Sequence, residues 1–100
     1  MALTKPHRKG NRIEQKVIDL FEAIGGRCIR SAGSHGPFDI VVFLGSAIFL
    51  LQIKANRKPS AVEIETMKSW HVAPNVTKAY VVWKDRTPIP DFWWEYEWRE

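Results

Sequence analysis

The sequence predicts an α/β fold whose elements run αβββαβ, with a mixed central sheet flanked by helices and an extra C-terminal strand. Three observations predict it. Apolar residues recur at helical spacing over 11–24, two apolar runs meet at a Gly-Ser step within 38–54, and aromatic residues occupy every second position near the C-terminus. Elements that are apolar on one face must pack in layers, so a sheet covered by helices accounts for this order.

The first helix is predicted over 11–24, because its apolar residues form one stripe: Ile13, Val17, Leu20, Phe21 and Ile24. Two consecutive glycines end this helix. Asn11 and Glu14 have the spacing of a capping box at its start. A short strand over 27–31 follows, and the composition of 32–37 is that of a loop.

Residues 38–54 carry the clearest signal in the chain. Two apolar β-rich runs are joined by Gly-Ser, and glycine supplies the positive φ that a tight hairpin turn needs. Asp39 starts the first strand, whereas Gln52 and Lys54 end the second and share one face. A hairpin brings these ends level, so an acid, an amide oxygen and an ammonium converge at one end of an apolar sheet. Burying such groups is costly unless they bind each other or a ligand, which indicates an active site.

The second half of the chain supplies one helix and two strands. Ser60 and Glu63 form a capping box that opens the helix, which runs to about residue 70 or 71. A strand over 78–84 follows. The last segment, 91–99, is predicted as a half-exposed strand with one aromatic face. That face comprises Phe92, Trp94, Tyr96 and Trp98.

Length and composition favour one folded domain over 1–100. The hydrophobic fraction is 45% and there are five Trp, which argues against disorder. The single Cys28 excludes an internal disulfide and suits a reducing cytoplasm. No apolar run reaches the roughly 18 residues that span a bilayer. We therefore expect an intracellular protein that does not engage membranes.

Positive charge is concentrated at the start of the chain. The formal net charge is +4, and residues 1–10 are expected to form a flexible basic arm. A one-sided positive field suits a polyanion such as DNA. An equally weighted alternative is a solvated tail that keeps the protein soluble. The charges in question are Lys5, Arg8, Lys9 and Arg12.

Four residues are candidates for chemistry. Asp39 suits a metal ligand, although Asp before a strand is also a common turn residue. Lys54 suits an ammonium that activates water or neutralises phosphate charge, or else a charge emerging into solvent. Gln52 offers an amide oxygen that can bind a hard cation, or a hydrogen bond at the strand end. Glu14 lies on the flank of the apolar stripe, where it can complete a metal site or cap its helix.

In this order, the residues resemble the PD-(D/E)xK nuclease superfamily, and within it archaeal-type Holliday junction resolvases and their viral relatives. The matching segments are 9–14, the apolar helix after it, 29–34, 38–41 and 51–54. The resemblance covers residues 8 to about 84. It implies a restriction-endonuclease-like αβββαβ core.

The resemblance also implies roles for individual residues. Glu14, Asp39 and Lys54 stand at catalytic positions, and Gln52 replaces the acid that the (D/E)xK element normally has. That replacement removes one negative charge and should weaken metal affinity. Arg30 and Ser34 are implied beside the substrate phosphates. A homodimer is implied too, because two sites are needed on a four-way junction.

The predicted function is a Mg²⁺- or Mn²⁺-dependent endodeoxyribonuclease, a Holliday junction resolvase acting in the cytoplasm or, if virus-encoded, in the host cytoplasm. The expected metal ligands are Glu14, Asp39, Gln52 and the Ile53 carbonyl. The expected contacts to the DNA backbone are Arg8, Lys9, Arg12, Arg30 and Ser34. Two alternatives stay open: a nuclease-like domain that only binds branched DNA, and a phage or restriction-type endonuclease acting on other DNA forms.

Overall fold

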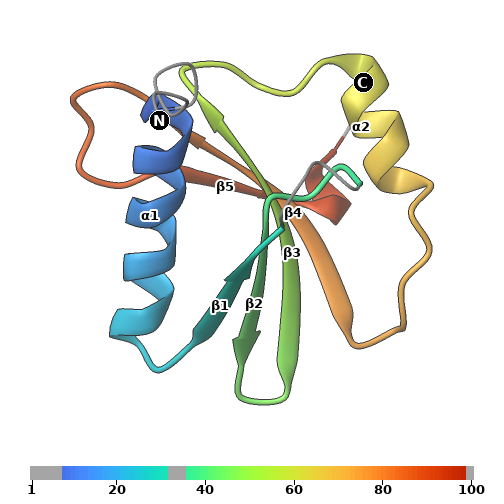
Figure 1. The fold of residues 1–100 in the computed structure, drawn as a ribbon. Coiled ribbons are helices and arrows are strands. Elements are labelled where there is room, and N and C mark those ends of the chain that lie inside the picture. The colour runs from blue at the N-terminus through green and yellow to red at the C-terminus, as the bar shows by residue number, and fades with distance from the viewer. Residues whose placement is uncertain (1–7, 32–35, 99–100) are drawn as a thin grey trace, which may run out of the picture.

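The fold is a five-stranded mixed sheet with one helix on each face (Figure 1). The structure is a computed structural model that describes residues 8–31 and 36–98, with side chains from Arg12 onward. The predicted order αβββαβ and the fifth strand are confirmed. The elements are α1 (Arg8–Ala23), β1 (Arg27–Arg30), β2 (Ile40–Leu44), β3 (Ala47–Ala55), α2 (Ala61–Lys68), β4 (Val76–Trp83), β5 (Asp91–Trp94) and the 3₁₀ helix η2 (Glu95–Glu97).

The strands follow chain order across the sheet, and one pair is parallel. β1, β2 and β3 form an antiparallel meander, β3 and β4 run parallel, and β5 returns antiparallel to β4. Parallel neighbours need a long crossover, which α2 and its flanking segments supply. The predicted hairpin joins β2 to β3, and Gly45 at its turn has φ +61°, the positive value expected there.

The face covered by α1 holds the larger core. Val17 of α1, Ile40 and Val42 of β2, Leu51 of β3 and Val81 of β4 are all fully buried in it. This packing follows from the apolar stripe of the helix and the alternation of the strands. Because alternate residues of each strand are buried against α1, the residues between them must point away from that helix.

The opposite face carries a smaller core beneath α2. It is built from Phe38, Met67, Tyr80, Val82 and Trp98. The start of α2 is fixed by the predicted capping box, in which the hydroxyl of the Ser60 N-cap accepts from the Glu63 amide and the Glu63 carboxylate accepts from the Ser60 amide. Apart from this core, the face leaves room for polar groups of β3.

Two expectations about the N-terminal region need correction. Helix α1 begins at Arg8, so residues 8–10 belong to the helix and not to an arm. Asn11 therefore lies inside α1, where it cannot be the N-cap, and the capping box with Glu14 is wrong. Residues 1–7, the rest of the predicted arm, lie outside the described residues.

The C-terminal prediction is wrong beyond Trp94. The strand ends there and the chain enters η2, whose carboxylate Glu97 accepts a hydrogen bond from the Trp94 amide at 2.8 Å. The turn carries Trp98 to the α2 face, where its indole donates to the Trp93 carbonyl. Tyr96, predicted beside Trp98, is instead 77% exposed. No helix in the described part of the chain has the length and apolarity to cross a membrane.

Candidate active site

A cleft of about 580 Å³ opens between the starts of β2 and α2, at the end of β3. It is lined by all four residues that the sequence predicts as catalytic: Glu14, Asp39, Gln52 and Lys54. Glu63 and Trp70, which the sequence did not single out for chemistry, line it too. The polar groups thus meet at one end of the sheet, where the hairpin geometry places them.

Asp39 is held by the neighbouring strand. Its carboxylate oxygen Oδ2 accepts from the backbone amide of Ile53 at 2.8 Å, and its own amide donates to the Leu51 carbonyl at 2.8 Å. Burial raises the pKa of the carboxyl, as does the Glu63 charge, while the Ile53 amide and the Lys54 ammonium oppose the rise. A carboxylate with a raised pKa in a cleft is a group that gains from binding a cation.

Gln52 presents an oxygen without a partner. The side chain is only 6% exposed, and its amide nitrogen donates to the Pro37 carbonyl at 2.9 Å, which fixes the amide. Its Oε1 is buried and has no hydrogen-bond partner among the described residues. An unsatisfied buried acceptor costs about 1–3 kcal/mol. The oxygen is therefore a ready acceptor for a cation or donor that enters the cleft.

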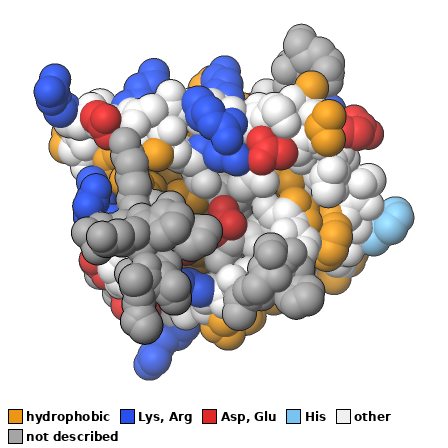
Figure 2. All heavy atoms as spheres, turned by 45° about the horizontal axis from the view of Figure 1, so that its top comes forward, with side chains coloured by type: hydrophobic (Ala, Val, Ile, Leu, Met, Phe, Trp, Pro, Cys, Tyr) orange, Lys and Arg blue, Asp and Glu red, His pale blue; other side chains and the backbone are white. Residues whose placement is uncertain are grey.

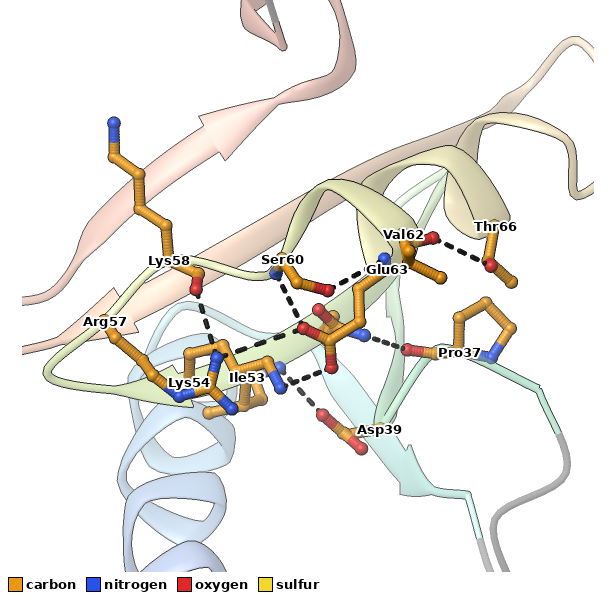
Figure 3. A network of polar contacts seen from close by, with 11 residues as sticks. Pro37, Asp39, Ile53, Lys54, Arg57, Lys58, Ser60, Val62, Glu63 and Thr66 are labelled. Atoms are coloured by element: carbon orange, nitrogen blue, oxygen red, sulfur yellow. Dashed lines mark hydrogen bonds and ion pairs between the residues drawn. The ribbon is translucent and has the colours of Figure 1, made fainter. Parts of the chain in front are cut away.

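Lys54 is engaged by a carboxylate from α2. Its Nζ lies 2.7 Å from Glu63 Oε2, and Figure 3 shows the two side chains reaching toward one another above Asp39. Glu63 Oε1 at the same time accepts from the Ser60 amide at 2.8 Å. The hydrogen bond from Lys54 lowers the pKa of the Glu63 carboxyl, and the Ser60 amide lowers it further. The sequence assigned Glu63 only a capping role, since the fold alone brings α2 to the end of β3.

Glu14 approaches the cleft from α1, as its place on the flank of the stripe predicts. Burial raises the pKa of its carboxyl, the Asp39 charge adds to the rise, and Arg30 opposes it. The Arg30 Nε lies 4.0 Å from Glu14 Oε1, and its guanidinium donates to Gln15 Oε1 at 2.8 Å. Arg30 is thus drawn toward α1, at the edge of the cleft, and is engaged with protein groups there.

Of the other four predicted DNA contacts, only Arg12 has a side chain that the structure describes. Arg12 is exposed on α1. Arg8 and Lys9 lie in α1, but nothing of their side chains is described, and Ser34 lies outside the described residues. Figure 2 shows Lys and Arg side chains along the upper edge and the left side of this face, with acidic side chains among them.

Two further lysines are held near the ends of β4 and β5 by aromatic rings. Lys16 of α1 lies 4.2 Å from the ring centroid of Trp83, and Lys58 lies 4.2 Å from that of Trp93. A cation over an aromatic face is held electrostatically and keeps its charge at the surface. No local pattern pairs these residues, because the partners are 67 (83 − 16) and 35 (93 − 58) positions apart in the chain.

The oxygen donors of the cleft fit a hard divalent cation. Two carboxylates, Glu14 and Asp39, and the Gln52 amide are ligand types that Mg²⁺ accepts. No three His, Cys, Asp or Glu side chains among the described residues are arranged to hold a metal without other help. A cation in this cleft would thus need the orphaned Gln52 oxygen or a backbone carbonyl beside the carboxylates.

Trp70 lies at the rim of the cleft. The periodicity of the sequence did not predict this position. Its indole is 44% exposed and meets Phe38 edge-on, with ring centroids 6.5 Å apart. A Cβ at Gly36 would lie 3.0 Å from the Trp70 ring, and Gly36 has φ +99°, so glycine is required on both counts. Gly36 therefore allows the backbone to pack closely against the Trp70 ring, and part of the indole stays exposed to solvent.

No protein-family model matches the sequence, and no curated protein matches it. Among solved structures, the chain is similar to the Holliday junction resolvase Hjc of Archaeoglobus fulgidus, an archaeal hyperthermophile. The TM-score is 0.70 at 21% identity, over 86% of this chain and 77% of that one. The resemblance expected from the sequence is thus confirmed at the level of the fold.

Proposed function

We propose that this protein is a Mg²⁺- or Mn²⁺-dependent DNA endonuclease that resolves four-way junctions. The observation that carries the proposal is the cleft in which Asp39, Lys54 and the unpartnered oxygen of Gln52 meet. A hard-cation site beside an ammonium suits hydrolysis of a phosphodiester, whose transition state gathers negative charge. The fold shared with an archaeal resolvase supports the same substrate class.

The metal would be held by the oxygen atoms of Asp39, Gln52 and Glu14, with the Ile53 carbonyl as a further ligand. When bound, a divalent cation supplies Lewis acidity toward the phosphate and lowers the pKa of a bound water. The protein's own part is to fix the ligands. The Ile53 amide orients the Asp39 carboxylate, and the Pro37 carbonyl orients the Gln52 amide.

Lys54 and the surface cations act on the substrate itself. The Lys54 ammonium would neutralise charge on the scissile phosphate in the transition state. Exposed Arg12 and Arg57, with Lys16 and Lys58, would hold the phosphate backbone on either side without reading sequence. We assign the DNA path to the surface beside the cleft because Arg57 and Lys58 follow the strand that carries Lys54, and Arg12 and Lys16 lie in the helix that carries Glu14.

A homodimer is part of the proposal, because two strands of a junction must be cut. The sheet face away from α1 exposes Ile29 by 58% and Phe43 by 40%. Ile29 belongs to the edge strand β1, and Phe43 belongs to the neighbouring strand β2. Exposed apolar side chains next to one another on a sheet favour burial by a partner.

One cleavage assay tests the proposal. Labelled four-way junction, fork, linear duplex and single strand of matched sequence are incubated with Mg²⁺, Mn²⁺ or EDTA. We expect paired cuts in the junction with either metal and none in EDTA. Cleavage of duplex or single strands in preference to the junction would instead establish an endonuclease on other DNA forms.

A second candidate is a domain that binds branched DNA without cutting it. It is favoured by Gln52, a neutral residue where the resembling nucleases carry an acid, and by the absence of a three-carboxylate cluster in the described residues. Tight junction binding with no metal-dependent cleavage of any DNA form would establish this candidate and overturn the enzyme.

A further inference from the structure

We propose that Glu63 is a positioning residue that holds the Lys54 ammonium in the cleft. The inference rests on the proposed function and adds to it a third carboxylate of the cleft, which α2 contributes. The observation is a carboxylate with two tasks: Oε2 accepts from Lys54 Nζ at 2.7 Å, and Oε1 accepts from the Ser60 amide at 2.8 Å (Figure 3).

The helix start fixes the carboxylate. Ser60 is the N-cap of α2, and its hydroxyl accepts from the Glu63 amide at 3.1 Å while its amide donates back to the Glu63 side chain. This reciprocal pair removes most of the rotamer freedom of Glu63. A negative charge is also favourable in the first turn of a helix, where backbone amides point outward. Glu63 is therefore a rigid anchor.

Lys54 gains order from this anchor. Lysine has a flexible four-carbon stem that is costly to immobilise. Its side chain is 16% exposed, so the ammonium sits largely within the protein and needs an acceptor. The residue two positions before it on β3 is the neutral Gln52, so its own strand segment supplies no carboxylate there. Glu63 supplies the charge from the neighbouring element.

An amide at position 63 cannot perform both tasks. A carboxylate accepts at two oxygens, whereas a glutamine side chain has one acceptor oxygen and one NH₂ donor. In Glu63→Gln, either the Ser60 amide or the Lys54 ammonium must lose its acceptor. Arg57, whose NH1 lies 3.9 Å from Glu63 Oε1, loses its nearby charge as well.

The test compares three variants of the full chain on four-way junction DNA. We expect Glu63→Gln to lower the single-turnover cleavage rate by about 10-fold to 100-fold, the range for losing a charged hydrogen bond that orients a catalytic group. Junction affinity, measured in Ca²⁺ or EDTA, should stay equal or rise, because a negative charge leaves the cleft. A structural defect would not split rate from affinity in this way.

Two matched controls separate positioning from helix stability. Ser60→Ala removes the cap hydroxyl but keeps the backbone amide that binds Glu63, so Tm should fall by about 4–8 °C while cleavage falls clearly less than in Glu63→Gln. Glu65→Gln makes the same charge change at an exposed site of the same helix and should leave cleavage unchanged. Equal losses in Glu63→Gln and either control would overturn the proposal.

A readout on the metal-free protein does not depend on activity. Ammonium protons that are hydrogen-bonded and shielded from water exchange slowly and give sharp lysine Nζ signals in NMR. We expect two such signals among the described lysines: Lys54, and Lys78, which is 4% exposed and donates to three backbone carbonyls. Glu63→Gln should abolish the signal that Lys54→Ala also removes and keep the other.

The NMR outcomes and the cleavage outcomes are independent. A wild-type spectrum without a protected Lys54 signal would overturn the positioning role even in an active enzyme. Conversely, an inactive wild type with a protected Lys54 that is lost in Glu63→Gln would refute the proposed function and leave the anchor intact.

Discussion

The two faces of β3 differ in what holds them together. Toward α1, the strand contributes Phe49, Leu51 and Ile53 to an apolar core. Toward α2, the alternate residues Gln52 and Lys54 enter a cleft, where each is held by a polar partner. On the α1 face, burial of apolar side chains stabilises the fold, whereas on the α2 face hydrogen bonds hold the polar side chains in place.

One strand can in this way serve both stability and chemistry. Because successive side chains point to opposite faces, a change on one face leaves the other face's neighbours in place. Burial of apolar side chains on the α1 face can therefore offset the free energy that is lost by burying polar groups on the α2 face. Four sets of substitutions test this separation, and the most disruptive comes first.

Leu51→Ala should lower the free energy of unfolding by about 2–5 kcal/mol, because Leu51 is fully buried in the α1 core. Its neighbour Leu50 provides a matched control, since it is the same residue type and is only partly buried on the opposite face. Leu50→Ala should cost clearly less. Urea titration followed by Trp fluorescence measures both, and equal losses would contradict the asymmetry between the faces.

Asp39→Asn and Lys54→Ala should each reduce junction cleavage by about 10²-fold or more, the usual cost of removing one group that stabilises transition-state charge. Junction affinity in EDTA should stay nearly the same, and the far-UV circular dichroism should be unchanged. The measurement is single-turnover cleavage at saturating protein. If both variants cut at the wild-type rate, the cleft is not the active site.

Gln52→Glu should lower the Mg²⁺ concentration needed for half-maximal cleavage. Gln52 lines the cleft and its amide oxygen lacks a hydrogen-bond partner, and a carboxylate would add the missing charge at the same position. Metal titration of cleavage measures the shift, and metal binding by the free protein gives a second readout. An unchanged metal dependence would remove Gln52 from the ligand set.

Asp39→Asn should also raise the Tm of the metal-free protein at pH 7 by a small amount. The folded pKa of Asp39 is raised above 3.8, so the folded state binds its proton more tightly than the unfolded state does. Stability from this group is therefore present below pH 3.8 and lost as pH rises through the folded pKa. The advantage of the Asp39→Asn variant should vanish when Tm is compared below that window. A Tm difference that is constant with pH would contradict this origin.

Local sequence signals predicted much of the architecture. The apolar stripe of α1, the Gly-Ser hairpin and the Ser60–Glu63 capping box all depend on neighbours within a few residues, and each is present. The strand predicted from alternating aromatic residues is wrong after Trp94, because alternation shows which residues are apolar and not where the chain turns. There, the hydrogen bonds of Glu97 and Trp98 outweigh strand propensity.

The meeting of Asp39, Gln52 and Lys54 could likewise be predicted from the sequence, since the register of one hairpin is a local property. The Glu63–Lys54 pair and the Trp70 rim could not, because they arise only when the chain has folded. Both require the parallel pairing of β3 with β4, which places α2 over the end of β3. Such a crossover is stabilised by burial of side chains distant in sequence, so no local pattern within α2 could place its charges beside the strand.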